Sequence, residues 1–547
     1  MEDVVTEGID SEARSFPDLI ARSAVRFADR DAVIDAAHRL SYADLDQQMR
    51  AATAAAAAAG IGPGDRVAIW APNCVRWVVA ALGVQACGAA IVPLSTRLRG
   101  EEAAYVIRAS GARALFTVRG FLDVDYPDLL TSAAPDCILP TVLLAGAARG
   151  DEATWDTFLS KGRDVPAAEV TARLDAVGPD SVSDIMFTSG TTGVPKGVLT
   201  THRQNLLGWR DYAKALLLNP DDRSLIVLPL SHNFGFKAGF VSSALVGAAG
   251  VMLDVFDLKR VLSLIESERI TVLSGTPTLA QGVLDSPLRA EFDVTSLRKG
   301  TIAGSAIPVE LIHRMRAENI LPHVMSGYGL SECAAGVALS EVDDPPEKIA
   351  TTCGRVRPHV QVRVIDDDGN EVPTGEPGEI TVAAPTVMLG YYDMPAETEA
   401  ALVDGWLRTG DIGTVDAEGY LRITDRKKDM FIVGGFNAYP AEIELALIQH
   451  PEIAEVAVVG VPDARMGEVG AAFVVRTPGS ELDADTLTPW MRERLANYKV
   501  PRHVRFVDSL PRNSMLKVDK LVLRPQARAL FAPEPARTES HVEGNAS

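Results

Sequence analysis

The spacing of hydrophobic residues along the chain alternates between the three-to-four-residue spacing of helices and the short apolar runs of strands. This alternation predicts helices and strands in turn. Apolar positions at helical spacing predict a helix over 16–30, and an Ala-rich helix over 40–59 is followed by a strand over 67–70. The longest apolar stretch, 78–94, contains Gln85 and is short for a membrane span, so we interpret it as a buried helix that runs into a strand. Such βα alternation is typical of a sheet with crossover helices.

The same alternation continues in the middle of the chain, after a turn-rich region at 140–180 without a clear pattern. We expect strands at 224–230, 251–254, 271–274, 301–303 and 323–325, and helices at 258–268 and 308–318, the second with a proline in its first turn. Between residues 355 and 425 the pattern changes to short alternating runs separated by turns, at 360–365, 379–382 and 420–424. This pattern predicts an antiparallel β subdomain.

A run of five charged residues, 425–429, indicates an exposed boundary. The segments beyond it predict a small α+β unit: strand 430–433, helix 440–449, strands 455–460 and 471–476, helix 486–497, and a last helix-sized segment that ends near Pro525. We therefore expect a large α/β region with a β subdomain at 1–427, hinged to a small mobile α+β domain at 428–528. The tail at 529–547 is rich in Pro, Glu, Ser and Gly, which predicts disorder.

Composition narrows the possible partners of this chain. A length of 547 residues is too great for one core. The net charge of −20 disfavours binding to nucleic acid or anionic lipid, so any polyphosphate site must be a local positive pocket. The five cysteines show no C-x-x-C spacing and the N-terminus lacks an apolar signal sequence, which together favour a reducing cytoplasm without stable membrane insertion.

The stretch Phe187–Gly197 carries the most informative local chemistry. A short apolar run precedes it and another follows, which predicts a strand, a polar loop and a second strand. Glycines allow the backbone N–H groups of such a loop to surround an anion. Hydroxyl groups add further hydrogen-bond donors, and Lys196 adds a positive charge. The loop residues are Thr188, Ser189, Gly190, Thr191, Thr192 and Gly193. The string is not a Walker motif, because Gly197 rather than Ser or Thr follows the lysine. Composition alone would also allow a flexible surface loop.

The whole string resembles the phosphate loop of the AMP-forming adenylating enzymes (the ANL superfamily), which include acyl-CoA synthetases, peptide-synthetase adenylation domains and luciferases. Seven further stretches, in the family's order and covering roughly residues 40–525, are similar to motifs of the same family. Among its members the chain is most similar to bacterial FadD-type acid–CoA ligases. The resemblance implies the fold described above, the substrates ATP and coenzyme A, and Mg²⁺.

The segment Leu228–Gly235 resembles the wall of the family's carboxylate site, where His232 would sit beside the acyl group. The acyl pocket implied by the resemblance contains His232, Asn233, Phe234, Gly235, Gly304 and Gly327. No Asp occurs between Ser231 and Gly239, and amino-acid-activating relatives commonly hold an ammonium group with one there, so an amino-acid substrate is disfavoured. Several glycines in these segments suggest room for a bulky acid: Gly235, Gly239, Gly304, Gly327 and Gly336.

Further motifs resemble the family's nucleotide site. Tyr328 would stack on adenine, Asp411 and Arg426 would bind the ribose, and Glu332 with Thr188 would hold Mg²⁺, a hard cation that favours oxygen ligands. The resemblance also places in the ATP site the residues Gly304, Ser305, Ala306, Ser326, Gly329 and Ser331. The catalytic residues it implies are Lys196, His232, Glu332 and Lys517. For the 303–306 segment alone, simple strand–helix packing explains the small side chains equally well.

In the small domain the resemblance implies a hinge at Lys428 and a loop for coenzyme A at Gly434, Gly435 and Phe436. Lys517 lies in the family's C-terminal lysine motif and would also contact ATP. Leu516 stands where the family usually has Gly, so the chain departs from the family's motif immediately before Lys517, and Leu cannot take every glycine backbone conformation.

These observations predict a two-step acid–CoA ligase whose partners are a small-molecule carboxylic acid, ATP and CoA. The stretch 231–239 looks most like ligases for ring-containing acids, including the steroid-degradation enzyme that activates a two-ring propanoate, although a medium- or long-chain acid stays open. Two alternatives remain: an enzyme that loads the acyl group onto a carrier protein, and a nucleotide-binding pseudo-enzyme, which only Leu516 suggests. Oligomeric state is not readable from the sequence.

Overall fold

Two compact units make up the chain, Met1–Ile423 and Thr424–Ser547. The computed structural model describes residues 9–188, 195–303, 307–426, 429–433, 436–463, 465–513 and 517–531, the side chains of 425, 426, 436 and 437 excepted. The division between the units falls close to the expected boundary at 427/428, which stays a prediction. Among the described residues, no helix is long and apolar enough to cross a membrane.

An eight-stranded sheet carries the phosphate-loop segment at one end, in the order β20-β9-β8-β4-β3-β5-β6-β7. Its strands are β3 (Arg66–Trp70), β4 (Ala90–Leu94), β5 (Ala114–Val118), β6 (Thr141–Ala145), β7 (Ala153–Thr154), β8 (Val182–Thr188), β9 (Lys196–Thr201) and β20 (Gly390–Tyr391). The strands from β8 to β7 are parallel neighbours, whereas β9 is antiparallel to β8 and to β20. The expected strand–loop–strand is confirmed, because Thr188 at the end of β8 pairs with Lys196 at the start of β9.

A second, seven-stranded sheet has the order β14-β13-β12-β10-β11-β1-β2 and is parallel except for the β1–β2 pair. Its strands are β1 (Asp31–Ile34), β2 (Arg39–Ser41), β10 (Arg223–Ile226), β11 (Ala249–Met252), β12 (Val272–Leu273), β13 (Lys299–Thr301) and β14 (His323–Met325). The predicted strand at 224–230 is therefore too long: it ends at Ile226. The strand predicted at 301–303 is β13, which begins and ends two residues earlier in the structure than predicted.

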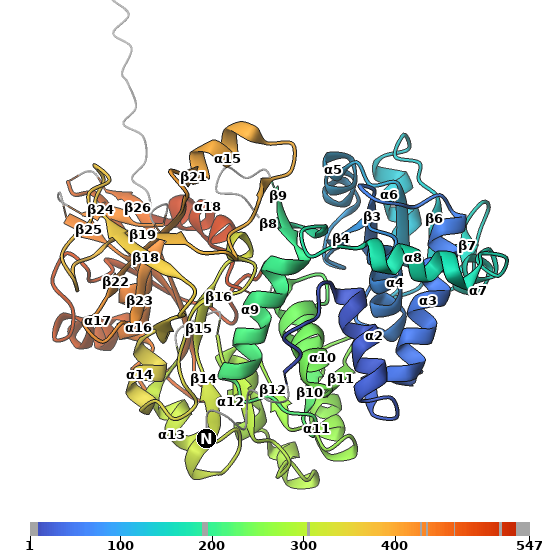
Figure 1. Cartoon of the computed structure of the whole chain (residues 1–547). Helices are drawn as coiled ribbons and strands as arrows, with labels where there is room; N and C mark the ends of the chain where they lie inside the picture. The colour runs from blue at the N-terminus through green and yellow to red at the C-terminus, as the bar shows by residue number, and fades with distance from the viewer. Residues whose placement is uncertain are drawn as a thin grey trace, which may run out of the picture. The chain divides into compact units, whose positions relative to one another are not determined.

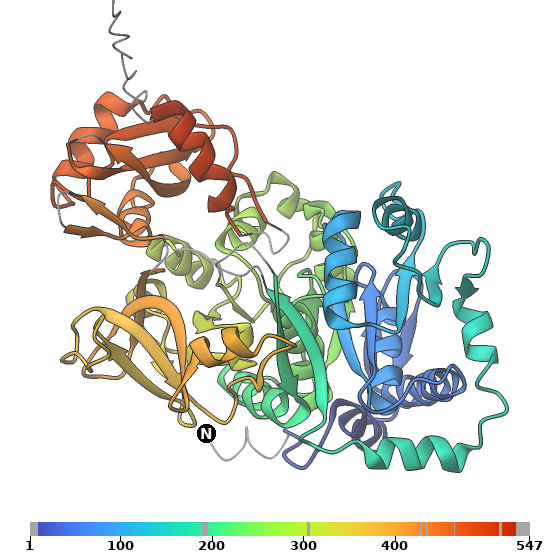
Figure 2. The ribbon, with the colours of Figure 1, turned by 90° about the horizontal axis from the view of Figure 1, so that it is seen from above.

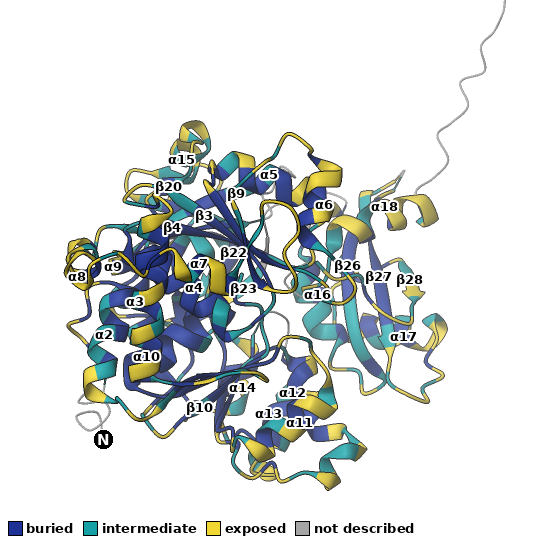
Figure 3. Cartoon of the chain, turned by 90° about the vertical axis from the view of Figure 1, so that its right-hand side faces the viewer, coloured by how far each residue is buried: buried dark blue, intermediate teal, exposed yellow. Residues whose placement is uncertain are grey.

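Helices connect these strands as the apolar spacing predicts (Figure 1). They are α2 (Phe16–Arg26), α3 (Tyr42–Ala58), α4 (Val75–Ala86), α5 (Gly100–Ser110), α6 (Tyr126–Ala133), α7 (Trp155–Ser160), α8 (Ala167–Ala176), α9 (His202–Ala215), α10 (Ser242–Val246), α11 (Leu258–Ser267), α12 (Pro277–Asp285), α13 (Val309–Ala317), α14 (Pro346–Thr351) and α15 (Pro395–Ala401). The region 140–180, which showed no clear pattern, holds β6, β7, α7 and α8. Pro308 is the N-cap of α13 rather than a first-turn residue. Almost every residue of α4 is buried, as the coloured ribbon of Figure 3 shows, which confirms the interpretation of 78–94 as a buried helix and strand.

The predicted antiparallel subdomain is confirmed. It consists of β18 (Gln361–Ile365), β19 (Gly378–Ala383), β21 (Leu402–Val403), β22 (Trp406–Val415) and β23 (Leu421–Arg426), and it is the yellow-to-orange layer in Figure 2. A separate three-stranded sheet contains β15 (Gly327–Gly329), β16 (Gly336–Leu339) and β17 (Arg355–Val356). Its first strand carries Tyr328.

The second unit is a five-stranded sheet with helices and its own core. Its elements are β24 (Phe431–Val433), β25 (Phe436–Ala438), α16 (Pro440–Leu447), β26 (Ile453–Asp463), β27 (Gly467–Arg476), α17 (Ala484–Arg492), β28 (His503–Phe506) and α18 (Lys520–Phe531). The prediction that the last helix ends near Pro525 is wrong, since α18 continues to Phe531 and includes the first three residues of the expected tail. Proline removes only one helical hydrogen bond, and the burial of Leu523 and Ala527 offsets that loss. Residues 532–547 lie outside the described residues.

Nothing in the sequence predicted the π-helix η1 (Phe234–Val241), which follows the end of β10 in the first unit. Its Lys237 is fully buried and its ammonium lies 2.8 Å from Asp184 Oδ1, also fully buried, on β8. The remaining lone pairs of Asp184 accept from Ser183 Oγ (2.6 Å), Asn205 Nδ2 (3.2 Å) and Thr200 Oγ1 (3.0 Å). The carboxylate is thus fully hydrogen-bonded, and burial lowers the pKa of Lys237 while Asp184 raises it.

We predict that Lys237→Met destabilises the protein by about 3–5 kcal/mol, because it leaves the Asp184 charge buried without its cation. The double variant Lys237→Met/Asp184→Asn removes both charges and should recover most of that loss. Chemical denaturation measures both, with Lys259→Met at an exposed position as the control. A double variant no more stable than Lys237→Met contradicts the ion-pair explanation.

His202 predicts a pH dependence of stability. It is fully buried beside this pair, its Nδ1 accepts from the Phe16 N–H at 3.2 Å, and burial lowers the pKa of its imidazole to about 3 from 6.5. The unfolded chain therefore binds the proton first, so the free energy of unfolding should fall as pH falls from 6.5 towards 3. His202→Asn should make this dependence shallower, while His323→Asn, at an exposed strand end, should keep the wild-type slope. Equal slopes for His202→Asn and wild type would show that His202 is not responsible.

Candidate active site

Three segments bring a lysine, a tyrosine and a glutamate together in the first unit. The β20 strand pairs with β9, which sets Tyr391 beside the start of the lysine strand. Lys196 Nζ lies 5.0 Å from the centre of the Tyr391 ring, and the Tyr391 hydroxyl donates to Glu332 Oε1 at 3.0 Å. Burial, and then the Glu332 charge, raise the pKa of Tyr391 well above its usual range, so the phenol stays a donor. Tyr391 thus contacts the Lys196 ammonium with its ring and the Glu332 carboxylate with its hydroxyl.

The residues in this cluster fit the magnesium ion that the family resemblance implies. Glu332 lies in the short helix η3 (Ser331–Cys333), and its backbone oxygen accepts from the Met388 N–H at 2.8 Å. Thr188, the other expected ligand, pairs directly with Lys196. No group of three or more His, Cys, Asp or Glu residues that could hold a metal exists among the described residues. One carboxylate completed by substrate phosphates and water is a usual magnesium site, so the oxygen donors present suit Mg²⁺.

A second polar cluster joins Tyr328 and Asp411. Tyr328 lies on β15 and Asp411 on β22, and the tyrosine hydroxyl donates to Asp411 Oδ2 at 2.5 Å. Burial, and then the Asp411 charge, raise the pKa of Tyr328 well above its usual range. The pair brings together the two side chains expected at adenine and ribose, which are 83 residues apart in sequence. Their assignment to the nucleotide stays a prediction.

For the other described residues expected in the ATP site, the structure gives a position but no contact that suggests a role at the nucleotide. The Ser326 hydroxyl donates to the Thr352 carbonyl at 3.1 Å, so it already has a structural partner. Gly329 ends β15 and Ser331 begins η3. Arg426 ends β23, with only its backbone described. Ser189, Gly190, Thr191, Thr192, Gly193, Gly304, Ser305 and Ala306 lie outside the described residues.

The expected acyl segment lies where β10 passes into η1. The Phe234 N–H donates to His232 Nδ1 at 3.2 Å, so a neutral His232 ring carries its proton on Nε2. Asn233 is nearly buried, and its Oδ1 has no hydrogen-bond partner among the described residues. Phe234 and Gly235 line an apolar pocket. Two of the residues expected in the acyl pocket therefore line this cavity, and the assignment of the acyl site stays a prediction.

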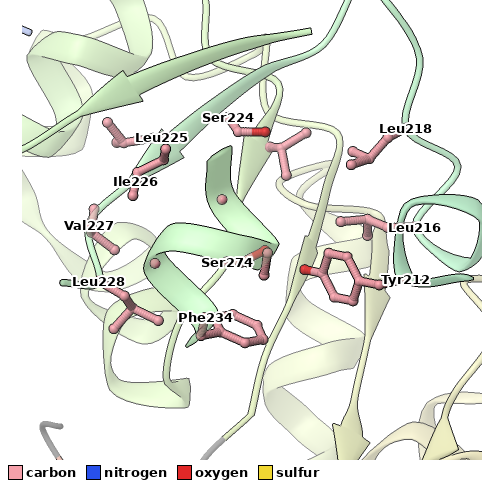
Figure 4. A pocket seen from close by; sticks show the side chains of 14 residues that line it. Tyr212, Leu216, Leu218, Ser224, Leu225, Ile226, Val227, Leu228, Phe234 and Ser274 are labelled. Atoms are coloured by element: carbon pink, nitrogen blue, oxygen red, sulfur yellow. The ribbon is translucent and has the colours of Figure 1, made fainter. Parts of the chain in front are cut away.

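The pocket lies between η1, α9 and the strands β10 and β12, and its cavity volume is about 20 Å³, room for about one water molecule (Figure 4). Most of its lining is aliphatic or aromatic, with three hydroxyl-bearing side chains. The lining residues are Tyr212, Leu216, Leu218, Ser224, Leu225, Ile226, Val227, Leu228, Phe234, Gly235, Ala238, Gly239, Val272 and Ser274.

At the four described glycines, a Cβ would meet neighbouring atoms, so the structure gives these glycines a packing role; room for a bulky acid stays a prediction. A Cβ on Gly235 would lie 2.1 Å from the Pro229 carbonyl oxygen, and one on Gly239 would lie 2.9 Å from Ile226. Gly327 and Gly336 would meet Leu339 in the same way, at 2.6 Å and 3.2 Å. These glycines are needed for close packing, and the space of the pocket comes from the arrangement of its larger side chains.

The second unit contains the residues expected to complete adenylation and to bind coenzyme A. Lys517 is exposed at a tight reversal, where the Asn513 N–H donates to the Lys517 carbonyl at 2.9 Å and the Lys517 N–H donates to Asn513 Oδ1 at 3.1 Å. Phe436 begins β25. Lys428, Gly434, Gly435 and Leu516 lie outside the described residues.

Sequence reasoning missed several residues that shape the site. Lys237 and Asp184 were each detectable as a lone charge inside an apolar run, which indicates a buried pair. No sequence pattern marked Tyr391 as a site residue, apart from the two consecutive tyrosines after Gly390. Tyr212 and Ser224 had none, because each becomes a pocket residue only through contacts between distant segments.

Comparisons with known proteins found matching family models and similar relatives. A model of the AMP-binding enzyme family matches residues 20–392, and a model of the AMP-binding enzyme C-terminal domain matches 442–517. The chain is 44% identical, over 94% of its length and 98% of the relative's, to the 3-[(3aS,4S,7aS)-7a-methyl-1,5-dioxo-octahydro-1H-inden-4-yl]propanoyl:CoA ligase of Rhodococcus jostii (strain RHA1). It is 34% identical to the long-chain-fatty-acid–CoA ligase FadD13 of Mycobacterium tuberculosis (strain ATCC 25618 / H37Rv), over 90% of this chain and 94% of the relative. The structure is also similar to ATP-bound MatB from Rhodopseudomonas palustris, with a TM-score of 0.82, 30% identity and coverage of 94% and 100%.

The Tyr391–Glu332 contact predicts a role in the response to magnesium. Hydrogen bonds that orient a metal-binding carboxylate typically change metal affinity about 10–100-fold when removed. Tyr391→Phe should therefore raise the Mg²⁺ concentration that half-saturates ATP-dependent pyrophosphate release by about tenfold. The matched control is Tyr392→Phe, whose ring lies by Arg66 instead. An unchanged magnesium requirement in Tyr391→Phe would move the metal site away from Glu332.

Proposed function

The chain belongs to the AMP-binding enzyme family, and from that premise we propose that it converts a bulky, ring-containing carboxylic acid to its CoA thioester. The protein is an ATP-dependent, AMP-forming acid–CoA ligase. The substrate carboxylate attacks the α-phosphorus of ATP, which gives acyl-AMP and pyrophosphate, and the CoA thiol then displaces AMP.

The apolar pocket beside His232 is the observation that carries the proposed substrate class. None of the described residues that line it is charged, so this lining does not suit an ammonium group or a second carboxylate. The lining is mostly aliphatic and aromatic, which suits an apolar acyl group once neighbouring side chains make room for it. The relative with 44% identity acts, by its name, on a propanoate that carries two fused rings. These observations support a fused-ring propanoate, with medium- and long-chain acids as the competing class.

The site residues have separate roles in this proposal. The first step brings a carboxylate anion to a polyphosphate, so most of the catalysis must come from charge neutralisation and alignment. Lys196 would leave its position over Tyr391 and contact the phosphates, and Glu332 with Thr188 would hold Mg²⁺, which neutralises phosphate charge when bound. His232, protonated on Nε2, would orient the acid, and the Tyr328–Asp411 pair would bind the nucleoside.

The second unit supplies the remaining roles. Lys517 would complete the adenylation site, and the 434–436 loop would bind the pantetheine arm of CoA. The two are about eighty residues apart in sequence, on either side of α16, so we propose that rotation at Lys428 presents them in turn. Five free thiols support a cytoplasmic location as part of the same proposal.

A panel of acids tests the substrate class. Fused-ring propanoates should give a higher kcat/KM for pyrophosphate release than straight-chain acids of similar carbon number, because a rigid ring system loses less conformational entropy on binding. Free CoA and a phosphopantetheine carrier protein, supplied in parallel, identify the acceptor. A preference for straight-chain acids would contradict the proposed class, and acylation of only the carrier would contradict the CoA ligase assignment.

Lys517→Ala tests the division between the two steps. It should lower acyl-AMP formation by about a hundredfold or more while synthetic acyl-AMP and CoA still give thioester. Lys520→Ala, whose ammonium pairs with Glu444 at 2.8 Å, is the control and should affect neither step selectively. Equal loss of both half-reactions in Lys517→Ala would contradict the proposed role.

A further inference from the structure

One tyrosine of α5 contacts the chain on both sides of the predicted phosphate loop. The Tyr105 hydroxyl donates to the Pro195 carbonyl at 3.0 Å, and the Tyr105 ring lies edge-on to the Phe187 ring, with 6.5 Å between the ring centres. Phe187 precedes the loop on β8, and Pro195 immediately precedes Lys196, the first residue of β9. Pro195 is 90 residues from Tyr105 in sequence, so no local pattern marked this contact.

The hydrogen bond from Tyr105 holds the peptide group that joins Pro195 to Lys196. Because a peptide group is planar, the direction of its carbonyl also fixes the Lys196 N–H and the Lys196 Cα. Proline has no backbone N–H, so this carbonyl is the only backbone hydrogen-bonding group that Pro195 has. On the other side of the lysine, the Tyr392 N–H donates to the Gly197 carbonyl at 2.7 Å. The backbone is therefore held immediately before and immediately after Lys196.

The aromatic contact holds the strand that enters the loop. Phe187 pairs with Gly197 across β8 and β9, and a Cβ on Gly197 would lie only 3.0 Å from the Phe187 ring. The missing side chain thus allows the Phe187 ring to lie close to β9, where its neighbour is the Tyr105 ring. Edge-on aromatic pairs are favourable beyond the apolar area that they bury. Tyr105 therefore links both strands at the base of the loop to α5.

We propose that Tyr105 is a positioning residue for adenylation, which sets through the Pro195 carbonyl where the Lys196 ammonium meets the polyphosphate of ATP. The inference rests on the proposed function, since it assumes that Lys196 contacts the phosphates. Lysine carries its charge on a flexible four-carbon stem, so a fixed backbone limits where the ammonium can lie. Pyrophosphate has left before the CoA thiol reacts, so the role of Tyr105 belongs to the first step.

Tyr105→Phe removes the hydroxyl and keeps the ring beside Phe187. It should lower kcat/KM for ATP in pyrophosphate release by about three- to tenfold, the range expected for one neutral hydrogen bond. Conversion of synthetic acyl-AMP and CoA to thioester should stay at the wild-type rate, which a general loss of structure would not allow. The matched control is Tyr126→Phe on α6, which removes a hydroxyl that donates to the Thr96 carbonyl at 3.1 Å and should change neither step.

A double variant tests whether Tyr105 acts through Lys196. Lys196→Ala should lower kcat/KM for ATP by about a hundredfold. Adding Tyr105→Phe to Lys196→Ala should then lower it by less than about twofold, because no ammonium remains to be positioned. Fold-losses that multiply in the double variant would overturn the inference, and so would equal loss of both half-reactions in Tyr105→Phe.

The single variants separate this inference from the proposed function. If Lys196→Ala loses pyrophosphate release and Tyr105→Phe does not, the role of Tyr105 is overturned and the proposed role of Lys196 stands. If Lys196→Ala releases pyrophosphate as fast as wild type, the proposed role of Lys196 fails and the inference fails with it.

Discussion

The buried pair of Asp184 and Lys237 is the constraint on which the geometry of the first unit depends. Asp184 lies on β8, whose last residue is Thr188, and Lys237 lies on η1, whose first turn lines the apolar pocket. Removing two charges from water costs more than a buried pair usually returns, so the pair contributes little net stability. Its consequence is positional: η1 can shift along β8 only by separating two fully buried charges. The pocket wall and the strand that leads to the phosphate loop are thereby fixed to one another.

In the predicted polar site, one tyrosine contacts two residues of opposite charge. Lys196 lies by the ring face of Tyr391, and Glu332 accepts from its hydroxyl. The proposed roles of these two residues, at the polyphosphate and at its metal, use side chains that this tyrosine holds close together. Exchange of a weak cation–π contact for a phosphate contact costs little, whereas breaking a buried salt bridge would cost several kcal/mol.

The sequence predicted the parts of this structure that depend on local patterns. The two α/β sheets, the antiparallel subdomain and the strand–loop–strand around Lys196 follow from apolar spacing and turn residues, and the family resemblance followed from uninterrupted strings. Contacts between distant segments were not predictable. Tyr391 meets Glu332 across 59 residues, and Lys237 meets Asp184 across 53. The π-helix was missed because its packing depends on one buried ion pair between distant segments, and the packing role of Gly235 shows only in its contact with the Pro229 carbonyl.

The central claim is that the carboxylate of an acid attacks the α-phosphorus of ATP and that the acyl group is then transferred to CoA, and isotope transfer tests it most directly. An accepted acid labelled with ¹⁸O in its carboxylate is converted with ATP and CoA, and the nucleotide product is analysed by mass spectrometry. The mechanism predicts AMP that carries one carboxylate-derived oxygen for each acyl-CoA formed, together with unlabelled pyrophosphate. ADP and phosphate as products, or AMP without the label, would contradict it.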